Sequence, residues 1–127
     1  MKTTLPTILL TTTLHAAPPE SFWRAMHQVE AGGKTGWRWG ATRRSLGPLQ
    51  ISRAYFRDSK VPGSWGKCTN LAYSKRVATA YLKRYAPRAW ATGDCQTLAR
   101  IHNGGPKGHK KRATVGYWVK IRRELEK

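Results

Sequence analysis

The chain has 127 residues, which is enough for one domain and excludes a multidomain enzyme. Its 24 lysines and arginines against six acids give a formal net charge of +18. That charge favours a polyanionic partner, either nucleic acid or a bacterial envelope that carries phosphates and carboxylates.

The first 17 residues have the order of a secretory signal peptide. A positive start at Lys2 precedes an uncharged apolar stretch over residues 5–14, and the small residues Ala16-Ala17 offer a cleavage site. The apolar stretch has about half of the roughly 20 residues that span a bilayer. We therefore expect residues 1–17 to be removed, and residues 18–127 to form one secreted domain without a transmembrane segment.

A first helix is expected to end at Glu30. Phe22, Met26 and Val29 recur on one helical face, and Gly32-Gly33 stop the helix. Glu30 therefore lies in the last turn, where the negative end of the helix dipole disfavours an ionised carboxylate.

The segment of residues 35–46 has no helical period and is rich in glycine, tryptophan and arginine. Trp37 and Trp39 alternate with Arg38, which predicts a short hairpin or an extended loop with both indoles on one face. The two rings are either part of the core or a stacking surface for sugars or bases.

The rest of the chain predicts helices that are separated by glycine- and proline-rich breaks. Apolar residues at helical spacing favour helices over residues 49–60, 70–85, 95–102 and 114–124. Asp94 is expected to cap the third of these, and residues 87–93 are expected to break the chain before it. The predicted fold class is α+β and mostly helical, with a small β or irregular region near residues 35–46.

Cys68 and Cys95 are the two cysteines of the chain. In an oxidising compartment we expect a disulfide between them, and two unpaired buried thiols are the alternative. Neither a CxxC pair nor a Cys/His cluster is present, so we expect no metal site and no cofactor.

The acids of the chain are few enough to assign one by one. They are Glu20, Glu30, Asp58, Asp94, Glu124 and Glu126. Helix starts and the C-terminus account for all of them except Glu30 and Asp58. Glycoside hydrolysis uses a protonated carboxylic acid and normally a second carboxylate, so these two are the leading pair for a two-carboxylate glycosidase.

The motifs around Glu30 resemble those of the invertebrate-type lysozymes, the destabilase family. In chain order the similar motifs are V-E-A-G-G, G-P-L-Q-I-S-R-A-Y-F-R-D, V-P-G-S-W-G-K-C, A-T-A-Y-L-K-R-Y-A, L-A-R-I-H-N-G-G-P-K-G and T-V-G-Y-W. Together they cover about residues 22–122. The wider superfamily of lysozymes and lytic transglycosylases shares the glutamate and a similar turn after it.

The resemblance implies a lysozyme-like fold over residues 18–127 and a secreted muramidase with Glu30 as general acid. The bond cleaved would be the β-1,4 bond between N-acetylmuramic acid and N-acetylglucosamine in peptidoglycan. The resemblance further implies that the sugar cleft is formed by Gln50, Tyr55, His102 and Asn103. For His102 and Asn103, a helix end followed by a turn is the alternative. We expect a monomer that binds peptidoglycan or an anionic bacterial envelope and does not bind nucleic acid.

The chain departs from the family pattern in its second carboxylate. Family members carry an aspartate between the glutamate and the G-P-x-Q-I turn, at the place of Gly40 or Thr42 here, and no acid occurs from Ala31 to Arg57. Asp58 replaces that acid only if the fold brings it close to Glu30. Two alternatives follow: a lytic transglycosylase that uses the same Glu30, and a non-catalytic cationic antimicrobial protein that binds the cell wall.

Overall fold

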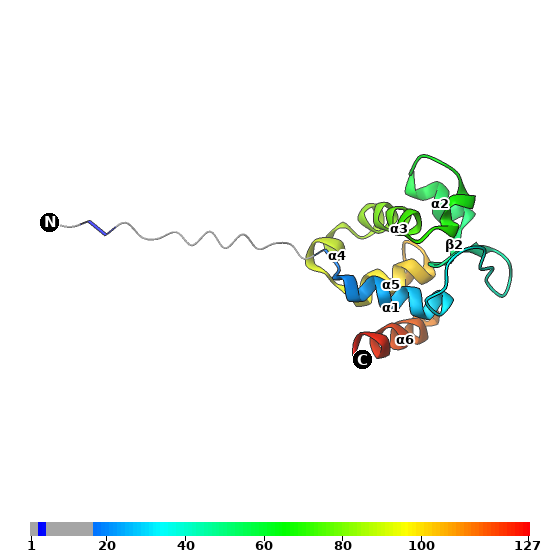
Figure 1. Cartoon of the computed structure of the whole chain (residues 1–127). Helices are drawn as coiled ribbons and strands as arrows, with labels where there is room; N and C mark the ends of the chain where they lie inside the picture. The colour runs from blue at the N-terminus through cyan, green and yellow to red at the C-terminus, as the bar shows by residue number, and fades with distance from the viewer. Residues whose placement is uncertain (1–2, 5–16) are drawn as a thin grey trace.

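The computed structural model of the chain describes residues 3–4 and 17–127, so the predicted signal peptide lies almost wholly outside the described residues. The helices pack into one body, and the two short strands lie at the end opposite α4 (Figure 1). The elements in chain order are α1 (Glu20–Ala31), β1 (Ser45–Leu46), β2 (Ile51–Ser52), α2 (Arg53–Ser59), η1 (Trp65–Thr69), α3 (Leu71–Tyr85), α4 (Pro87–Thr92), α5 (Cys95–Gly104), η2 (Gly108–Lys110), η3 (Arg112–Thr114) and α6 (Val115–Leu125), where η marks a 3-10 helix. Within the described ranges, no helix is both long and apolar enough to cross a membrane.

The helix α1 ends where its glycines predict. Gly32 adopts a left-handed conformation with φ 61°, and its N–H donates to the carbonyl of Gln28. Phe22 and Met26 are fully buried on the face that packs between the other helices. The prediction that Glu30 lies in the last turn of this helix is confirmed.

The β region lies slightly later in the chain than residues 35–46. The strands β1 and β2 pair antiparallel, with Ser45 opposite Ser52 and Leu46 opposite Ile51, and Trp39 adds an isolated bridge to Leu46. The predicted helix over residues 49–60 therefore begins only at Arg53. Residues 49–50 instead belong to the turn between the strands, where the backbone has positive φ at Gly47 and at Gln50, and Ile51–Ser52 form β2.

The turn between β1 and β2 requires glycine at position 47. Gly47 has φ +83°, and a Cβ added there would collide with the main-chain carbonyl of Cys68 in η1. Gly36 has a similar φ of +86° but open space around its Cβ position, so Gly36→Ala carries the backbone strain without the collision.

We expect Gly47→Ala to lower the free energy of unfolding by about 3 kcal/mol. Gly36→Ala should lower it by only about 1 kcal/mol, the usual cost of a left-handed non-glycine residue. Urea denaturation of both variants tests this expectation. Equal losses would show that strain alone, without the contact to Cys68, explains the need for glycine.

The helices from α3 onward lie close to their predicted ranges, with one correction in residues 87–93. The predicted cap of α5 forms, since Asp94 accepts from the N–H of Thr97, and α3 has a similar cap in Asn70, which accepts from the N–H of Tyr73. Residues 87–93, predicted to be a break, contain the short helix α4, because a proline at the first helical position costs no hydrogen bond. In α6 the buried face is formed by Tyr117 and Ile121, whereas Val115 is 45% exposed.

The two cysteines do not form the predicted disulfide in the structure, where both thiols are free. Cys68 is fully buried in η1, which packs against α3 and β1, and Cys95 is half-buried at the start of α5. The two residues thus belong to separate elements, η1 and α5, which both pack against α3. Burial raises the pKa of Cys68 to about 11, so this thiol stays protonated at neutral pH.

Candidate functional site

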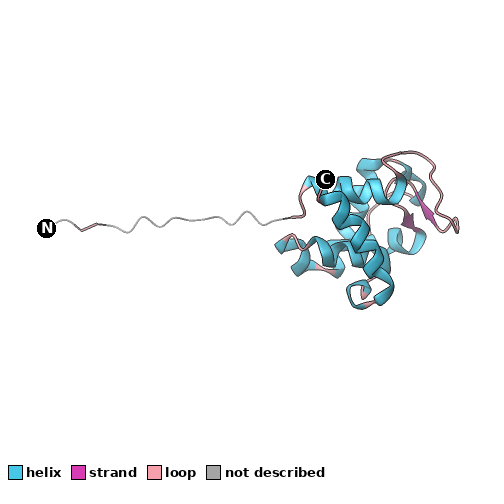
Figure 2. Cartoon of the chain, turned by 90° about the horizontal axis from the view of Figure 1, so that it is seen from below, coloured by secondary structure: helices cyan, strands magenta, loops and turns pink. Residues whose placement is uncertain are grey.

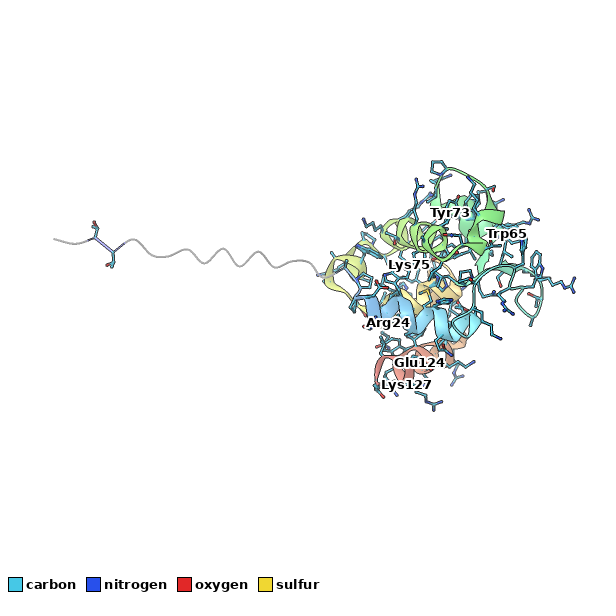
Figure 3. All side chains as sticks on the ribbon, viewed as in Figure 1. Arg24, Trp65, Tyr73, Lys75, Glu124 and Lys127 are labelled. Carbon is cyan, nitrogen blue, oxygen red and sulfur yellow. The ribbon has the colours of Figure 1, made fainter. Side chains whose placement is uncertain are left out.

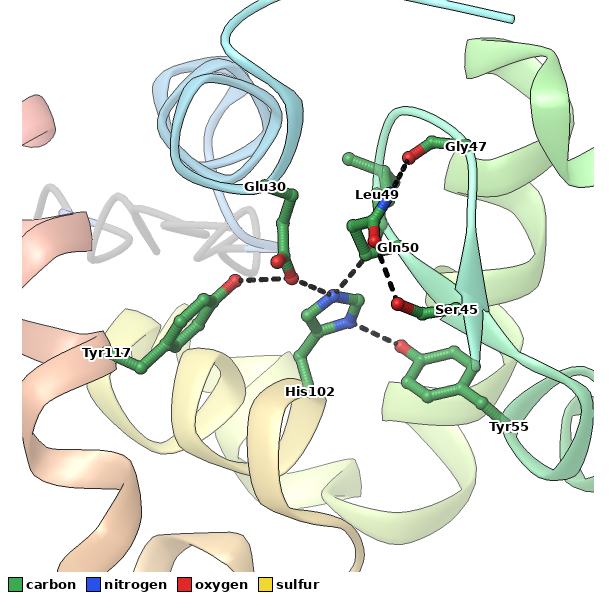
Figure 4. A network of polar contacts seen from close by, with 8 residues as sticks. All are labelled: Glu30, Ser45, Gly47, Leu49, Gln50, Tyr55, His102 and Tyr117. Atoms are coloured by element: carbon green, nitrogen blue, oxygen red, sulfur yellow. Dashed lines mark hydrogen bonds and ion pairs between the residues drawn. The ribbon is translucent and has the colours of Figure 1, made fainter. Parts of the chain in front are cut away.

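Glu30 lies where three parts of the fold meet. Its side chain leaves the end of α1 and faces His102 on α5, Tyr117 on α6 and the turn between β1 and β2 (Figure 4). The packing of α6 against both α1 and α5 holds these groups together. The Glu30 side chain is 16% exposed, so it is shielded but remains open to solvent on one side.

Both polar contacts of the Glu30 carboxylate fall on the same oxygen. The hydroxyl of Tyr117 donates to Oε2 over 3.1 Å, and Nε2 of His102 lies 3.1 Å from the same atom. Among the described residues no side chain or main-chain group donates a hydrogen bond to Oε1. A proton carried by Glu30 therefore resides on Oε1, the oxygen that is free to meet a substrate.

His102 is held in one tautomer by its other contacts. Its side chain is 1% exposed, and Nε2 also lies 3.0 Å from the carbonyl oxygen of Leu49, which can only accept. Nε2 must therefore carry a hydrogen. In the neutral ring Nδ1 then accepts from the hydroxyl of Tyr55 over 2.8 Å. The result is a chain of contacts from Tyr55 through His102 to Glu30.

Tyr55 and Tyr117 close this network at its two ends. Tyr55 is buried and stacks on Tyr81, with ring centroids 3.7 Å apart. Burial raises the pKa of the Tyr55 phenol well above its ordinary value, and charge on Tyr81 and on Glu30 adds to the shift. Burial, followed by the charge of Glu30, raises the pKa of Tyr117 in the same direction. Both phenols therefore remain hydrogen-bond donors at neutral and moderately alkaline pH.

The raised pKa values of Tyr55 and Tyr117 predict a loss of stability in alkali. Below about pH 10, the ordinary tyrosine pKa, both phenols are protonated in the folded and unfolded states, so their contribution is complete. Above it, only the unfolded state loses these protons, and the free energy of unfolding should fall as pH rises. Urea midpoints measured from about pH 8 to about pH 11 test this. Tyr117→Phe should reduce the slope, and an unchanged slope would contradict the assignment.

Gln50, predicted to contact the sugar, uses its side chain to brace the β region. Its amide nitrogen donates to the carbonyls of Arg38 and Gly47 over 2.7 and 2.8 Å, and its oxygen accepts from the hydroxyl of Ser45 over 2.8 Å. Contact between Gln50 and a sugar therefore stays a prediction. The same amide ties the segment around Arg38 to the turn beside Glu30.

The place expected for a second carboxylate is closed by these same side chains. A Cβ added at Gly40 would lie 2.7 Å from Oε1 of Gln50 and would also collide with the hydroxyl of Ser45. Thr42, the other candidate position, is exposed. An aspartate at position 40 would have to displace the side chain of Gln50 and break its hydrogen bonds. The hydrogen bonds of Gln50 are therefore compatible with glycine at position 40 and not with the aspartate of the family pattern.

The structure does not bring Asp58 to Glu30. Asp58 lies near the end of α2, where its main-chain carbonyl accepts from Arg84. Its carboxylate is one of the groups near Tyr81, whose pKa rises to about 12 through burial first, then Tyr85, then Asp58. Among the described contacts of Glu30 there is no second carboxylate.

The remaining acids have other partners. Glu20 pairs with Lys75, Glu124 with Lys127, and Glu126 with Arg122, while Asp94 caps α5. Glu30 is therefore the sole acid of the part of the chain described that takes part in this network.

The remaining predicted cleft residues divide by exposure. His102 and Tyr55 are buried, and they contact each other and, through His102, Glu30. Contact of either residue with a sugar stays a prediction. Asn103 is exposed on the last turn of α5, and its predicted contact with substrate stays a prediction. The expected helix end after His102 is confirmed, because α5 stops at Gly104.

Tyr117 was missed by the sequence reasoning. Its partner Glu30 is 87 positions away, and no local pattern joins them. The available signals were its place in the motif T-V-G-Y-W and its spacing four residues before the buried Ile121, which puts both residues on one helical face.

Most of the chain is similar in sequence to a known protein family and to known lysozymes. The model of the Destabilase family matches residues 24–124. Lysozyme 1 of Crassostrea virginica is 42% identical over 101 residues, which cover 77% of this chain and 55% of that protein. A lysozyme of Meretrix lusoria is 42% identical over 81 residues, which cover 62% of this chain and 66% of that protein. The chain thus spans less than two thirds of the length of either lysozyme.

Solved structures share the fold. The crystal structure of Tapes japonica lysozyme matches with a TM-score of 0.72 and 28% sequence identity, over 85% of this chain and 91% of that chain. The inhibitor-bound lysozyme from Meretrix lusoria matches with a TM-score of 0.71 and 30% identity, over the same shares of the two chains.

Proposed function

Because the chain belongs to the destabilase family, as its motifs predicted, and shares the fold of solved invertebrate lysozymes, we propose that it is a lysozyme-type glycoside hydrolase. Its substrate is peptidoglycan, and it cleaves the β-1,4 bond between N-acetylmuramic acid and N-acetylglucosamine. Glu30 is the general acid.

The single observation that carries this proposal is the one-sided contact of the Glu30 carboxylate. Tyr117 and His102 hold Oε2, so the carboxyl group has a fixed orientation and Oε1 is left without a hydrogen-bond partner among the described residues. The proton on Oε1 passes to the glycosidic oxygen as the bond from that oxygen to C1 of the sugar breaks. The carboxylate left behind keeps two donors on Oε2, which stabilise its new charge.

The second half of the reaction has to proceed without a protein carboxylate on the opposite face of the sugar. The position of Gly40 is closed by Ser45 and Gln50, and Asp58 lies with Tyr81. Water therefore attacks C1 directly or after the acetamido group of the substrate has stabilised the cation. Glu30, now ionised, accepts the proton of that water, so that it acts first as acid and then as base.

The absence of a partner acid at Gly40 also favours a second candidate function, lytic transglycosylation. In that reaction the 6-hydroxyl of the muramic acid residue takes the place of water and an anhydro sugar forms. The same Glu30 would serve both reactions. Secretion is part of the proposal as well, and the order of charge, apolar stretch and small residues in residues 1–17 supports it.

The bond that is cleaved tests the proposed function. Purified peptidoglycan is digested, the products are reduced with borohydride, and the sugars at the new ends are identified by mass spectrometry. We expect reduced N-acetylmuramic acid. New ends made of N-acetylglucosamine would show that a different bond is cut, and an absence of new ends would favour the non-catalytic antimicrobial alternative.

A further inference from the structure

Three tryptophans and an arginine form a row on the surface of the β region. The ring centroids of Trp37 and Trp39 lie 5.8 Å apart, and those of Trp39 and Trp65 are also 5.8 Å apart. The guanidinium of Arg53 covers Trp65 at 4.2 Å from its ring centroid. Trp37 is 64% and Trp39 is 45% exposed, so neither ring belongs to the core, which was one of the two interpretations left open by the sequence.

The row is held in place by main-chain contacts. The indole N–H of Trp65 donates to the carbonyl of Ile51 over 2.8 Å, and Trp39 bridges to Leu46 in β1. The N–H of Gly36 donates to the carbonyl of Thr69 in η1 over 3.0 Å. These contacts fix the loop on both sides of the exposed rings, so a partner meets a surface that is already ordered.

This surface faces away from the site around Glu30. A Cβ at Gly40 would point toward Gln50, on the side of the ribbon that borders the site. Neighbouring residues of an extended segment point to opposite sides, and Trp39 accordingly packs against Trp65. Trp65 lies beside α2 at the end of the molecule that carries the strands (Figure 3). The tryptophan row is therefore separate from the proposed catalytic site.

The charged residues of the loop that carries Trp37 and Trp39 are all basic. The basic residues of this loop and of the adjoining turn of α2 are exposed, and they are Lys34, Arg38, Arg43, Arg44 and Arg53. No acid occurs in the sequence from Ala31 to Arg57, and none of these basic residues takes part in an ion pair within the described part of the chain. The guanidinium of Arg53 lies on the same surface as the indoles, and Arg43 and Arg44 lie in the same exposed loop, whereas Arg38 alternates with the two tryptophans and points to the other side.

We propose that this surface docks onto an anionic lipid bilayer whose headgroups carry phosphate. Indole rings prefer the boundary between headgroups and acyl chains, where their apolar body is buried and their polar edge is hydrated. Guanidinium groups bind phosphate through paired hydrogen bonds. An uncharged sugar chain would use the rings of Trp37 and Trp39 but would leave the arginines without partners.

The shape of the loop agrees with a flat partner. The segment before β1 extends beyond the helices at one end of the body in two perpendicular views (Figures 1 and 2). A protruding loop can reach a bilayer without interference from the rest of the molecule. The docking surface goes beyond the proposed enzymatic function and does not depend on Glu30.

Vesicle binding by the full folded chain tests the proposal. Binding to phosphatidylglycerol–phosphatidylcholine vesicles is measured by co-sedimentation and by the blue shift of tryptophan fluorescence. A triple variant, Arg53→Gln with Arg43→Gln and Arg44→Gln, removes three exposed charges beside the indoles. Since each basic residue at an anionic surface changes the partition constant about fivefold, we expect a loss of about 100-fold.

The matched control removes the same charge elsewhere, from the exposed residues Lys107, Lys110 and Arg112, each replaced by Gln. It should lose far less binding. The double variant Trp37→Ala/Trp39→Ala keeps the charge and should lose about tenfold together with the blue shift. Because these side chains are exposed, all variants should cleave soluble peptidoglycan fragments at the wild-type rate, which separates this test from that of the enzyme function.

Three results would overturn the proposal. Equal losses in the two triple variants would show attraction by net charge alone. Unchanged vesicle binding of the tryptophan double variant would remove the indoles from the interaction. Loss of binding to peptidoglycan with no loss of binding to vesicles would identify the row as a sugar-stacking surface.

Discussion

Replacing Glu30 by Gln is expected to lower the rate of peptidoglycan cleavage by about 100- to 10,000-fold, the range over which general acids contribute. Glutamine has the shape of glutamate and can keep contacts with Tyr117 and His102, but its amide cannot supply the proton to the leaving oxygen. The measurement is kcat on soluble peptidoglycan fragments. The free energy of unfolding should change little.

A matched control is Glu126→Gln, which removes the charge of an exposed glutamate at the C-terminal end of the chain. It should retain wild-type kcat. If Glu30→Gln retained full lytic activity on cell walls, the enzymatic interpretation would be wrong, and disruption of the envelope by the basic surface would explain lysis.

Replacing His102 by Ala is expected to affect both stability and activity. The ring is buried and contacts Glu30, the carbonyl of Leu49 and the hydroxyl of Tyr55, so its loss leaves a cavity and unpaired polar groups. A loss of about 3 kcal/mol in the free energy of unfolding follows. The rate should also fall, because Glu30 loses a donor that orients its carboxylate.

Tyr55→Phe separates the positioning role of His102 from its packing role. Phenylalanine preserves the ring stacked on Tyr81 but removes the hydroxyl that donates to Nδ1 of His102. We expect kcat to fall by about tenfold with an unchanged KM, because an unfixed imidazole orients Glu30 less well. A lower stability with unchanged kcat in both His102→Ala and Tyr55→Phe would show that this network is purely structural.

The sequence predicted those parts of the fold that depend on local chemistry. Gly32 ends α1 and Asp94 caps α5, and each effect acts within one helical turn. The turn before α2 was mistaken for helix because Leu49 and Ile51 fit a helical face, whereas the positive φ at Gln50 leaves no trace in residue type.

The candidate site was predictable only in part. Glu30 emerged because the chain has so few acids that elimination is informative. Its contacts with His102 and Tyr117 span 72 and 87 positions, and only the packing of α1, α5 and α6 brings them together. The burial of Tyr55 behind His102 likewise depends on the packing of α2 on α3, which no local pattern of the sequence indicates.

The sequence shows that the family aspartate is missing at position 40, but it does not show that neighbouring side chains occupy the space of that carboxylate. Gly40 lies against Ser45 and Gln50, whose hydrogen bonds fill the space that a carboxylate would need. In the proposed reaction the protein thus provides a group for proton transfer to the leaving oxygen but no carboxylate for the attack on C1. Proton transfer has a positioned acid in Glu30, whereas the attack on C1 relies on water and on the substrate.

The central claim, hydrolysis by a single positioned carboxyl group, is tested most directly by digesting peptidoglycan in water enriched in heavy oxygen. Mass spectrometry of the products should show one heavy oxygen atom at C1 of each new N-acetylmuramic acid end, and Glu30→Gln should form almost none of this product. Ends that form as anhydro sugars without heavy oxygen would contradict hydrolysis and establish transglycosylation, and labelled ends formed equally fast by Glu30→Gln would contradict the role of Glu30.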